Sequence, residues 1–327
     1  MILTLIEHDR GRLNELSLEA LTFGRLLGER LGVTQHALLI GEAAQQIAGD
    51  LGGFGTEIVH LAVHDELSEY APRAWARSLV ELVTTLQPGV VVASASDRGA
   101  EVMAYAASIL AAPLAANCIE VVDAPSDDAW TVTRQRWGGS LLEVARVAAP
   151  VKLLTVAPHA LLPVRSEAAG ATEVAPFTPS LTDGDVAARV TGRVEAGAGK
   201  VSLSEAKVVV GGGRGVGGAE GFGRLEELAG LLGGAVGCSR VVTSNGWRPH
   251  TDQIGQTGTR IAPDLYIACG ISGATQHIVG CRAAKKILVI NTDAEAPILT
   301  QADYAIIGDL AQIVPAISAE IRKASGG

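Results

Sequence analysis

The residues best suited to ligand chemistry lie in a long loop between two short apolar runs, residues 235–237 and 265–269. The loop is rich in Gln, Thr, Gly and Arg, contains a tryptophan, and follows neither a helical nor a strand period. A loop of this length inside a compact domain is usually a binding loop or a disordered segment, and this composition favours binding. Because polar donors on glycine-rich backbone suit a large anionic ligand, the loop predicts a site for one.

Polar side chains also follow each of five apolar runs in the second half of the chain. The runs are residues 208–210, 235–237, 265–269, 287–290 and 304–307. The helical segments that separate most of them are residues 223–232, 272–284 and 309–323. Strands alternating with helices predict a doubly wound parallel sheet, whose ligands bind outside the carboxyl ends of the strands. The polar residues at those ends are Arg214, Ser239, Arg240, Ser272, Asn291 and Asp309.

A glycine-rich segment, GGGRGVGG at residues 211–218, follows the first of these runs. It contains the GxGxxG pattern of dinucleotide-binding domains, at Gly213, Gly215 and Gly218. That fingerprint also requires an acidic residue about 20 positions further on to hold a ribose, and residues 232–242 contain no Asp or Glu. We therefore favour a tight strand–helix turn that brings Arg214 and backbone N–H groups close to a ligand.

Each of these side chains also has an ordinary structural interpretation. Ser272 and Asp309 suit the N-cap positions of the helices that follow them, and Asn291 suits a turn. His277 lies among apolar neighbours, as a core histidine would, and Arg240 has the character of a surface cation. The residues alone leave both interpretations open at each position.

The first half of the chain predicts a second parallel α/β domain. Its expected strands are residues 2–5, 37–40, 58–63, 90–93, 153–156 and 186–194, and its expected helices are residues 16–31 and 100–110. Residues 130–148 hold two strand-like runs around Gly138 and Gly139, which predicts an added β-hairpin. A crossing rich in Pro, Ala and Gly then leads to a domain boundary near residues 195–204, so we expect domains 1–198 and 199–327. No comparable site is evident in the first domain, which suits a docking role.

Composition excludes several classes of function. The chain has 327 residues, 48% hydrophobic residues and a net charge of −9 without a basic run, which argues against nucleic acid as a partner. No apolar stretch reaches the length of a membrane span, and the N-terminus lacks a signal-peptide pattern. The four cysteines lack CxxC spacing, so we expect neither structural zinc nor a disulfide framework. Free cysteines of this kind predict a cytoplasmic location.

Several strings together resemble the alpha subunit of electron transfer flavoprotein. They are GCSR at residues 237–240, QIGQTG at 253–258, APDLY at 262–266, GISGATQH at 270–277, INTDAEAPI at 290–298, ADYAIIGDL at 302–310 and LIEHDRGRLNELSLEALT at 5–22. The resemblance covers the whole chain and is densest over residues 208–314. Cys238, Thr275 and Thr292 replace the residues the family often has, Ala, Ile and Lys, and none of these changes removes a polar group from the expected site.

The resemblance implies an FAD in the C-terminal domain, at the junction with a beta subunit. It places Arg240 against the isoalloxazine ring, Thr257 on flavin N5, Gln256 near O4 and His277 on the O2 side. The remaining positions would serve the ribityl, pyrophosphate and adenosine parts. The complete set of expected FAD contacts is Arg214, Ser239, Arg240, Ile254, Gly255, Gln256, Thr257, Ser272, Gly273, Ala274, Thr275, Gln276, His277, Asn291, Asp309 and Leu310.

These implied roles agree with the charge that a flavin gains on reduction. A fixed guanidinium and an imidazole near N1, O2 and N5 lower the energy of the anionic flavin. The resemblance implies a non-enzymatic electron carrier of fatty acid β-oxidation. It would take electrons from dehydrogenases of the acyl-CoA type and pass them to electron transfer flavoprotein–quinone oxidoreductase or a similar acceptor. Two alternatives remain: a subunit of an electron-bifurcating NADH-linked complex, and a module that senses a nucleotide without redox work.

Overall fold

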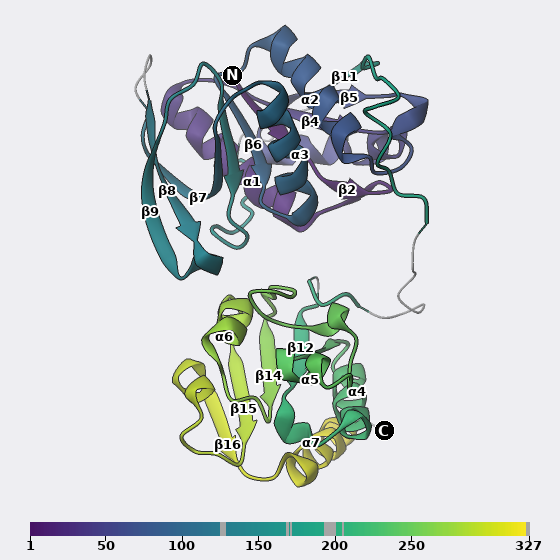
Figure 1. The fold of residues 1–327 in the computed structure, drawn as a ribbon, viewed down its shortest axis with the longest axis vertical. Coiled ribbons are helices and arrows are strands. Elements are labelled where there is room, and N and C mark those ends of the chain that lie inside the picture. The colour runs from purple at the N-terminus through teal and green to yellow at the C-terminus, as the bar shows by residue number, and fades with distance from the viewer. Residues whose placement is uncertain (125–128, 168–169, 171, 193–200, 205, 325–327) are drawn as a thin grey trace. The chain divides into compact units, whose positions relative to one another are not determined.

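The computed structural model describes residues 1–124, 129–167, 170, 172–192, 201–204 and 206–324. The chain divides into two compact units, Met1–Arg193 and Val194–Gly327, each with its own sheet (Figure 1). This confirms the predicted fold class of two α/β domains. The boundary predicted between residues 198 and 199 lies outside the described residues.

The first unit is built on a nine-stranded sheet with the strand order β11-β5-β4-β1-β6-β10-β7-β8-β9. Its strands are β1 (Ile2–Leu5), β4 (Gln35–Ile40), β5 (Thr56–Ala62), β6 (Val90–Ser94), β7 (Leu114–Asp123), β8 (Trp130–Arg136), β9 (Leu141–Val147), β10 (Lys152–Val156) and β11 (Glu173–Phe177). All neighbours from β11 to β7 are parallel, whereas β7, β8 and β9 pair antiparallel. The predicted hairpin is β8–β9, at one edge of the sheet. A further pair of short strands, β2 (His8–Asp9) and β3 (Arg12–Leu13), follows β1.

Helices cover both faces of this sheet (Figure 1). They are α1 (Glu15–Leu31), α2 (Pro72–Leu86) and α3 (Asp97–Ile109). Ile2 of β1 clusters with Phe23 of α1, whereas its neighbour Leu3 clusters with Leu79 of α2 and Met103 of α3. The inner strands are therefore buried on both faces, which explains why they read as continuous apolar runs.

Several elements of the first unit differ from the sequence prediction, which missed strand β7 and the short strands β2 and β3. Helix α2 was not predicted, although Pro72 in its first turn is a typical start signal. Strand β11 was also missed, because it contains Pro176, and proline argues against an inner strand. β11 lies at the edge of the sheet, where a proline is compatible with strand pairing. The strand predicted over residues 186–194 is wrong for its described part: residues 186–192 form bends and coil, held by Val190 N–H donating to the carbonyl of Tyr70.

The second unit contains a five-stranded sheet with the order β13-β12-β14-β15-β16, in which all pairs are parallel. Its strands are β12 (Val208–Gly212), β13 (Ala235–Cys238), β14 (Leu265–Cys269), β15 (Ile287–Asn291) and β16 (Tyr304–Ile307). Its helices are α4 (Phe222–Leu231), α5 (Arg240–Ser244), α6 (Thr275–Cys281) and α7 (Leu310–Ala324). Val210 packs with Phe222 of α4 and Val314 of α7, whereas Val209 packs with Cys281 of α6. The doubly wound sheet predicted for this domain is thus confirmed.

The glycine-rich segment after β12 lets two backbone loops touch. The N–H groups of Gly213 and Gly215 donate to the carbonyls of Cys269 and Gly270, over 2.9 and 3.0 Å. A Cβ at Gly213 would overlap the carbonyl oxygen of Gly270, and one at Gly215 would lie 2.7 Å from the Cα of Gly270. These two glycines are therefore required for close packing of the loops that follow β12 and β14.

Two further findings concern the helices and the cysteines. No helix in the described part of the chain is long and apolar enough to cross a membrane. The four cysteines are free and buried, and burial raises the pKa of each thiol to about 12. They are therefore uncharged core residues.

Candidate functional site

The polar residues predicted at the strand ends of the second unit meet at one edge of its sheet. Because the five strands are parallel, their carboxyl ends share that edge. Backbone hydrogen bonds join neighbouring ends: Ser239 N–H donates to Gly212 O over 3.0 Å, and Gly308 N–H donates to Asn291 O over 2.9 Å. The long loop after β13 and helix α6 after β14 both start from this edge.

The long loop is ordered rather than irregular throughout. It contains α5 and a 3₁₀ turn at His250–Asp252, and Ile254 N–H donates to Cys238 O over 2.8 Å. The loop then packs on α6, where Gln256 N–H donates to Gln276 O over 2.8 Å. A Cβ at Gly255, where φ is +150°, would lie 2.9 Å from the same carbonyl oxygen. The loop residues expected at the flavin ring are thus held beside the first turn of α6.

Thr257 stands at the exposed tip of this loop, and a buried glutamine supports it. The Gln253 side chain is 2% exposed, and its Nε2 donates to Thr257 Oγ1 over 3.0 Å. Its Oε1 lies 2.9 Å from the Thr243 hydroxyl on α5. Because the Thr257 oxygen accepts from Gln253, its own proton is free to be donated outward. Sequence reasoning missed Gln253, although it opens the QIGQTG string.

His277 is buried in the first turn of α6, and one of its ring nitrogens is unsatisfied. The residue is 6% exposed, and its Nε2 lies 2.8 Å from the hydroxyl of Tyr266 on β14. Its Nδ1 is buried and makes no hydrogen bond of normal length and angle with a described residue, although the backbone of Ile254 is close enough to oppose the lowering of the His277 pKa. Burial lowers the pKa of His277 to about 4, so the ring is neutral near pH 7. The predicted flavin contact therefore coincides with an unpaired polar atom.

Ser239 and Arg240 present two further groups without partners at the end of β13. Ser239 Oγ is buried and has no hydrogen-bond partner within the described part of the chain. The Arg240 side chain is exposed, and its guanidinium forms no ion pair or hydrogen bond with another described residue. By contrast, Arg248 in the same loop pairs with both Glu226 and Asp252. Arg240 is thus an available cation beside a buried hydroxyl.

At Asp309 and Asn291 the structure agrees with the ordinary structural interpretations, a helix N-cap and a turn residue. Asp309 caps α7, since its Oδ1 accepts from Ala311 N–H over 2.8 Å, as expected for an N-cap. Asn291 organises a turn, since its side-chain oxygen accepts from Asp293 N–H over 3.1 Å and its amide donates to Ile271 O over 2.9 Å. Both side chains are therefore partly occupied within the protein.

The N-cap predicted at Ser272 is wrong. Helix α6 begins at Thr275 with Ala274 as its N-cap residue, and no side chain caps it. The start is delayed because Gly273, at φ +87°, turns the chain against Ile298, where a Cβ would overlap the Ile298 backbone. Ser272 is exposed at the edge, as are Ala274, Thr275 and Gln276, whereas Gly273 and Leu310 are buried.

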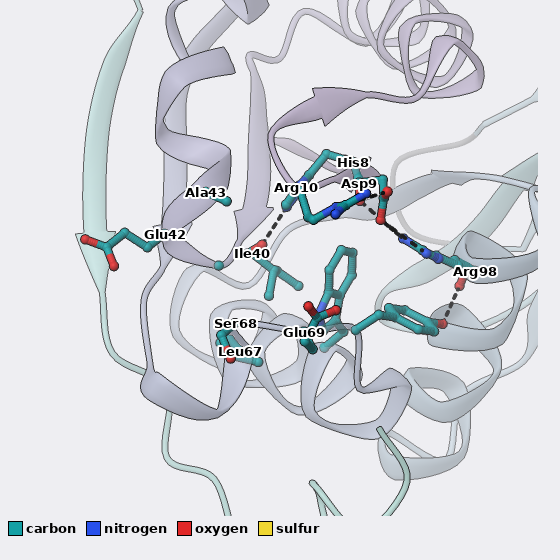
Figure 2. Close-up of a pocket in the computed structure, with 13 residues that line it drawn as sticks. His8, Asp9, Arg10, Ile40, Glu42, Ala43, Leu67, Ser68, Glu69 and Arg98 are labelled. Atoms are coloured by element: carbon teal, nitrogen blue, oxygen red, sulfur yellow. Dashed lines mark hydrogen bonds and ion pairs between the residues drawn. The ribbon is translucent and has the colours of Figure 1, made fainter. Parts of the chain in front are cut away.

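The first unit contains a pocket of about 240 Å³ that the sequence did not indicate (Figure 2). It lies beyond the carboxyl ends of β1 and β4, and His8, Asp9, Arg98 and Trp75 are among its lining residues. Asp9 pairs with Arg98 over 3.5 Å, and Arg98 also lies 4.8 Å from the ring centre of Tyr70. His8 has partners at both ring nitrogens, the carbonyl of Ile40 and the N–H of Gly11, and burial lowers its pKa.

The families that match this chain agree with the two units. Residues 2–182 match the family described as the electron transfer flavoprotein domain, and residues 202–282 match the electron transfer flavoprotein FAD-binding domain. An electron transfer flavoprotein subunit alpha from Thermoanaerobacterium thermosaccharolyticum is 35% identical over 320 residues, which cover 97% of this chain and 96% of the relative.

Two other relatives match to a similar extent. Protein FixB of Clostridium saccharobutylicum is 35% identical over 320 residues, covering 97% of this chain and 95% of the relative. The electron transfer flavoprotein subunit alpha of Bacillus subtilis is 34% identical over 325 residues, covering 98% and 97%.

A doubly wound unit with donors at its strand ends, matched by an FAD-binding family, defines a flavoprotein whose cofactor is FAD. The matches extend over nearly the whole length of both this chain and its relatives. The chain belongs to the alpha-subunit family of electron transfer flavoproteins, whose members normally pair with a beta subunit.

Proposed function

We propose that this chain is the FAD-binding alpha subunit of a heterodimeric electron carrier. It accepts electrons from flavoprotein dehydrogenases of the acyl-CoA type and passes them to an electron transfer flavoprotein–quinone oxidoreductase or a similar acceptor. The observation that carries this proposal is the group of unpaired donors at one sheet edge. The guanidinium of Arg240, the hydroxyl of Ser239 and Nδ1 of His277 all lack partners among the described residues.

The chemistry of these groups fits an isoalloxazine ring. When FAD is bound, it supplies the electron transfer chemistry. Arg240 supplies a planar guanidinium, a group that suits stacking on or beside an aromatic ring and would stabilise negative charge on a bound reduced flavin. The proton of Thr257, directed outward by Gln253, suits an acceptor nitrogen such as flavin N5.

The rest of the edge suits the longer part of FAD. The exposed residues Ser272, Ala274, Thr275 and Gln276 lie next to the loop that bears Arg214, because Gly215 N–H donates to Gly270 O. Backbone N–H groups and a free cation are appropriate partners for a pyrophosphate. The adenosine half would then lie toward Asn291, Asp309 and Leu310, at the ends of β15 and β16. Ile254 and Gly255 are buried and directly precede Gln256 and Thr257, so they would support the part of the loop expected at the isoalloxazine ring.

The β8–β9 hairpin of the first unit supports a partner subunit. Strand β9 lies at the edge of the sheet. Its Leu142 and Val144 are 66% and 69% exposed, and Trp137 at the hairpin turn is 75% exposed. Exposed apolar side chains on an edge strand favour pairing with another chain. We therefore propose that the beta subunit docks on this hairpin.

Purification of the chain with its beta subunit tests this function. We expect one non-covalent FAD per alpha chain, and bleaching of its absorbance when a reduced acyl-CoA-type dehydrogenase is added. FMN, or no flavin after gentle purification, would contradict the proposal. Two flavins per heterodimer together with reduction by NADH would instead support the electron-bifurcating alternative.

A further inference from the structure

We propose that Tyr266 is a positioning residue that sets the tautomer of His277, so that Nδ1–H of the neutral imidazole is held as a donor toward the flavin. This proposal rests on the FAD site proposed above. Its geometric basis is the 2.8 Å contact between the Tyr266 hydroxyl and Nε2 of His277, together with the buried and unpaired Nδ1. The two residues come from different elements, β14 and α6, and both belong to the buried interior of the second unit.

The inventory of protons selects one tautomer. Tyr266 is 0% exposed, and burial raises the pKa of its phenol well above the ordinary value, so the hydroxyl keeps its proton. Within the described residues, Nε2 of His277 is the hydrogen-bond partner of that hydroxyl. If the hydroxyl donates to Nε2, the neutral ring must carry its single proton on Nδ1.

The opposite arrangement satisfies fewer groups. If Nε2–H donated to the phenol oxygen, the Tyr266 proton would be buried without an acceptor among the described residues, and Nδ1 would be an unpaired acceptor as well. In the proposed arrangement a single donor, Nδ1–H, is left for a ligand. Since each unpaired buried polar group costs desolvation free energy, the arrangement with fewer such groups is favoured.

The surrounding backbone holds the pair in place. A Cβ at Gly211 of β12 would overlap the phenol oxygen, so this glycine makes the space that Tyr266 occupies. A Cβ at Gly280 of α6 would overlap the backbone of Gly255, so α6, which carries His277, is packed tightly against the long loop after β13. A hydrogen-bond donor supported in this way loses little freedom when an acceptor arrives.

The consequence concerns flavin O2 and N1, which gain negative charge on reduction. A neutral N–H donor at a fixed position would favour the reduced flavin without placing a charge in the buried part of the site. Removing the phenol hydroxyl leaves both imidazole tautomers available, so part of the population presents an acceptor where the flavin needs a donor.

The test is ¹⁵N NMR of the full chain purified with its beta subunit and labelled at histidine, with and without FAD. We expect His277, assigned by the signal lost in His277→Gln, to show a protonated Nδ1 and an unprotonated Nε2 in both states. In Tyr266→Phe the signals should move toward the other tautomer, and FAD affinity should fall about three- to tenfold, the effect of one neutral hydrogen bond. Tyr304→Phe is the matched control, at a residue that is 61% exposed, and it should change neither the His277 signals nor FAD affinity.

Two outcomes would overturn the proposal: a protonated Nε2 in the wild-type protein, or unchanged His277 signals in Tyr266→Phe. The wild-type spectrum alone decides the tautomer if Tyr266→Phe does not fold. Failure of the proposed FAD site has a different signature, because the predicted tautomer would then be present while FAD neither binds nor shifts the His277 signals.

Discussion

The two units place polar side chains at the same position, beyond the carboxyl ends of parallel strands, but they satisfy them differently. In the first unit Asp9 pairs with Arg98, Tyr70 with Glu101, and His8 with two backbone groups. One lining atom of its pocket, Nε1 of Trp75, is buried without a partner among the described residues. In the second unit, Arg240, Ser239 Oγ and His277 Nδ1 lack partners among the described residues.

This difference separates a structural pocket from a candidate ligand site. Parallel topology brings strand-end residues together in any such sheet, so polar residues at the strand ends are compatible with either role. A buried polar group without a partner costs free energy unless a ligand satisfies it. The group of unsatisfied donors at the end of β13 and the start of α6, together with the match to the FAD-binding family, favours the second unit as the FAD site, and five changes can test this.

The largest effect is expected for Gly213→Ala. Its Cβ would overlap the carbonyl oxygen of Gly270, and backbone cannot move aside cheaply, so we expect a loss of about 3 kcal/mol or more and loss of FAD. Gly223→Ala in α4 is the matched control, because a Cβ there meets nothing within 4 Å. Denaturant unfolding and flavin content measure both. Equal stability of the two variants would contradict the close loop packing.

Arg240→Ala should lower the midpoint potential of bound flavin without unfolding the protein, since the side chain is exposed. The lost interaction with negative charge on the flavin is roughly 1–3 kcal/mol after solvent screening. Arg240→Lys should rescue it in part, because it restores charge but not the planar group. Arg224→Ala, an exposed arginine on α4, is the control. A redox titration unchanged by Arg240→Ala would remove this residue from the site.

Leu142→Asp tests the docking role of the first unit. A carboxylate in an apolar interface should weaken the heterodimer by about tenfold or more while leaving the isolated chain folded, because Leu142 is 66% exposed. Leu162→Asp, at a residue that is 74% exposed but outside the hairpin, should have no effect. Analytical ultracentrifugation of the mixed subunits measures this. Wild-type association of the Leu142 variant would exclude the hairpin as the docking surface.

Acid should destabilise both units through histidines that burial keeps neutral. Burial lowers the pKa of His60 and His277 to about 4, whereas it is about 6.5 in an unfolded chain. Between these values the unfolded state binds more protons, so stability is complete above about pH 6.5 and is lost as pH falls toward 4. From pH 7 to pH 5 we expect each histidine to cost on the order of 1–2 kcal/mol.

Urea titrations at several pH values check this expectation. The pH slope of stability should decrease in His60→Gln and in His277→Gln. FAD should protect only the second unit against acid. Slopes that match wild type in both buried variants would contradict the assignment of neutral histidines.

The smallest effect is expected for Arg98→Ala in the pocket of the first unit. Its contact with Asp9 is 3.5 Å long and partly exposed, so the loss of stability should stay below about 1 kcal/mol. Flavin content and midpoint potential should not change. A loss of FAD in this variant would mean that the two units do not differ in the way described above.

The sequence by itself determined the strand framework and the location of the site. Strands buried on both faces are continuous apolar runs, so β1, β4, β6, β14 and β15 could be predicted within a few residues. Parallel topology then places their ends at one edge, and the glycines after β12 indicate a close turn. The strings from residues 237 to 310 carried enough specific residues to indicate FAD.

Tertiary structure decided which polar groups remain unsatisfied. The local partners of Asn291 and Asp309, two residues away, agree with the turn and N-cap interpretations made from the sequence. The unpaired Nδ1 of His277 and the bond from Asn291 to Ile271 depend on how separate elements pack. The support that Gln253 gives to Thr257 depends on the fold of the loop. The contact of Tyr266 with His277 depends on how α6 packs against β14. No pattern of residue types contains this information, since satisfaction is a property of three-dimensional neighbours.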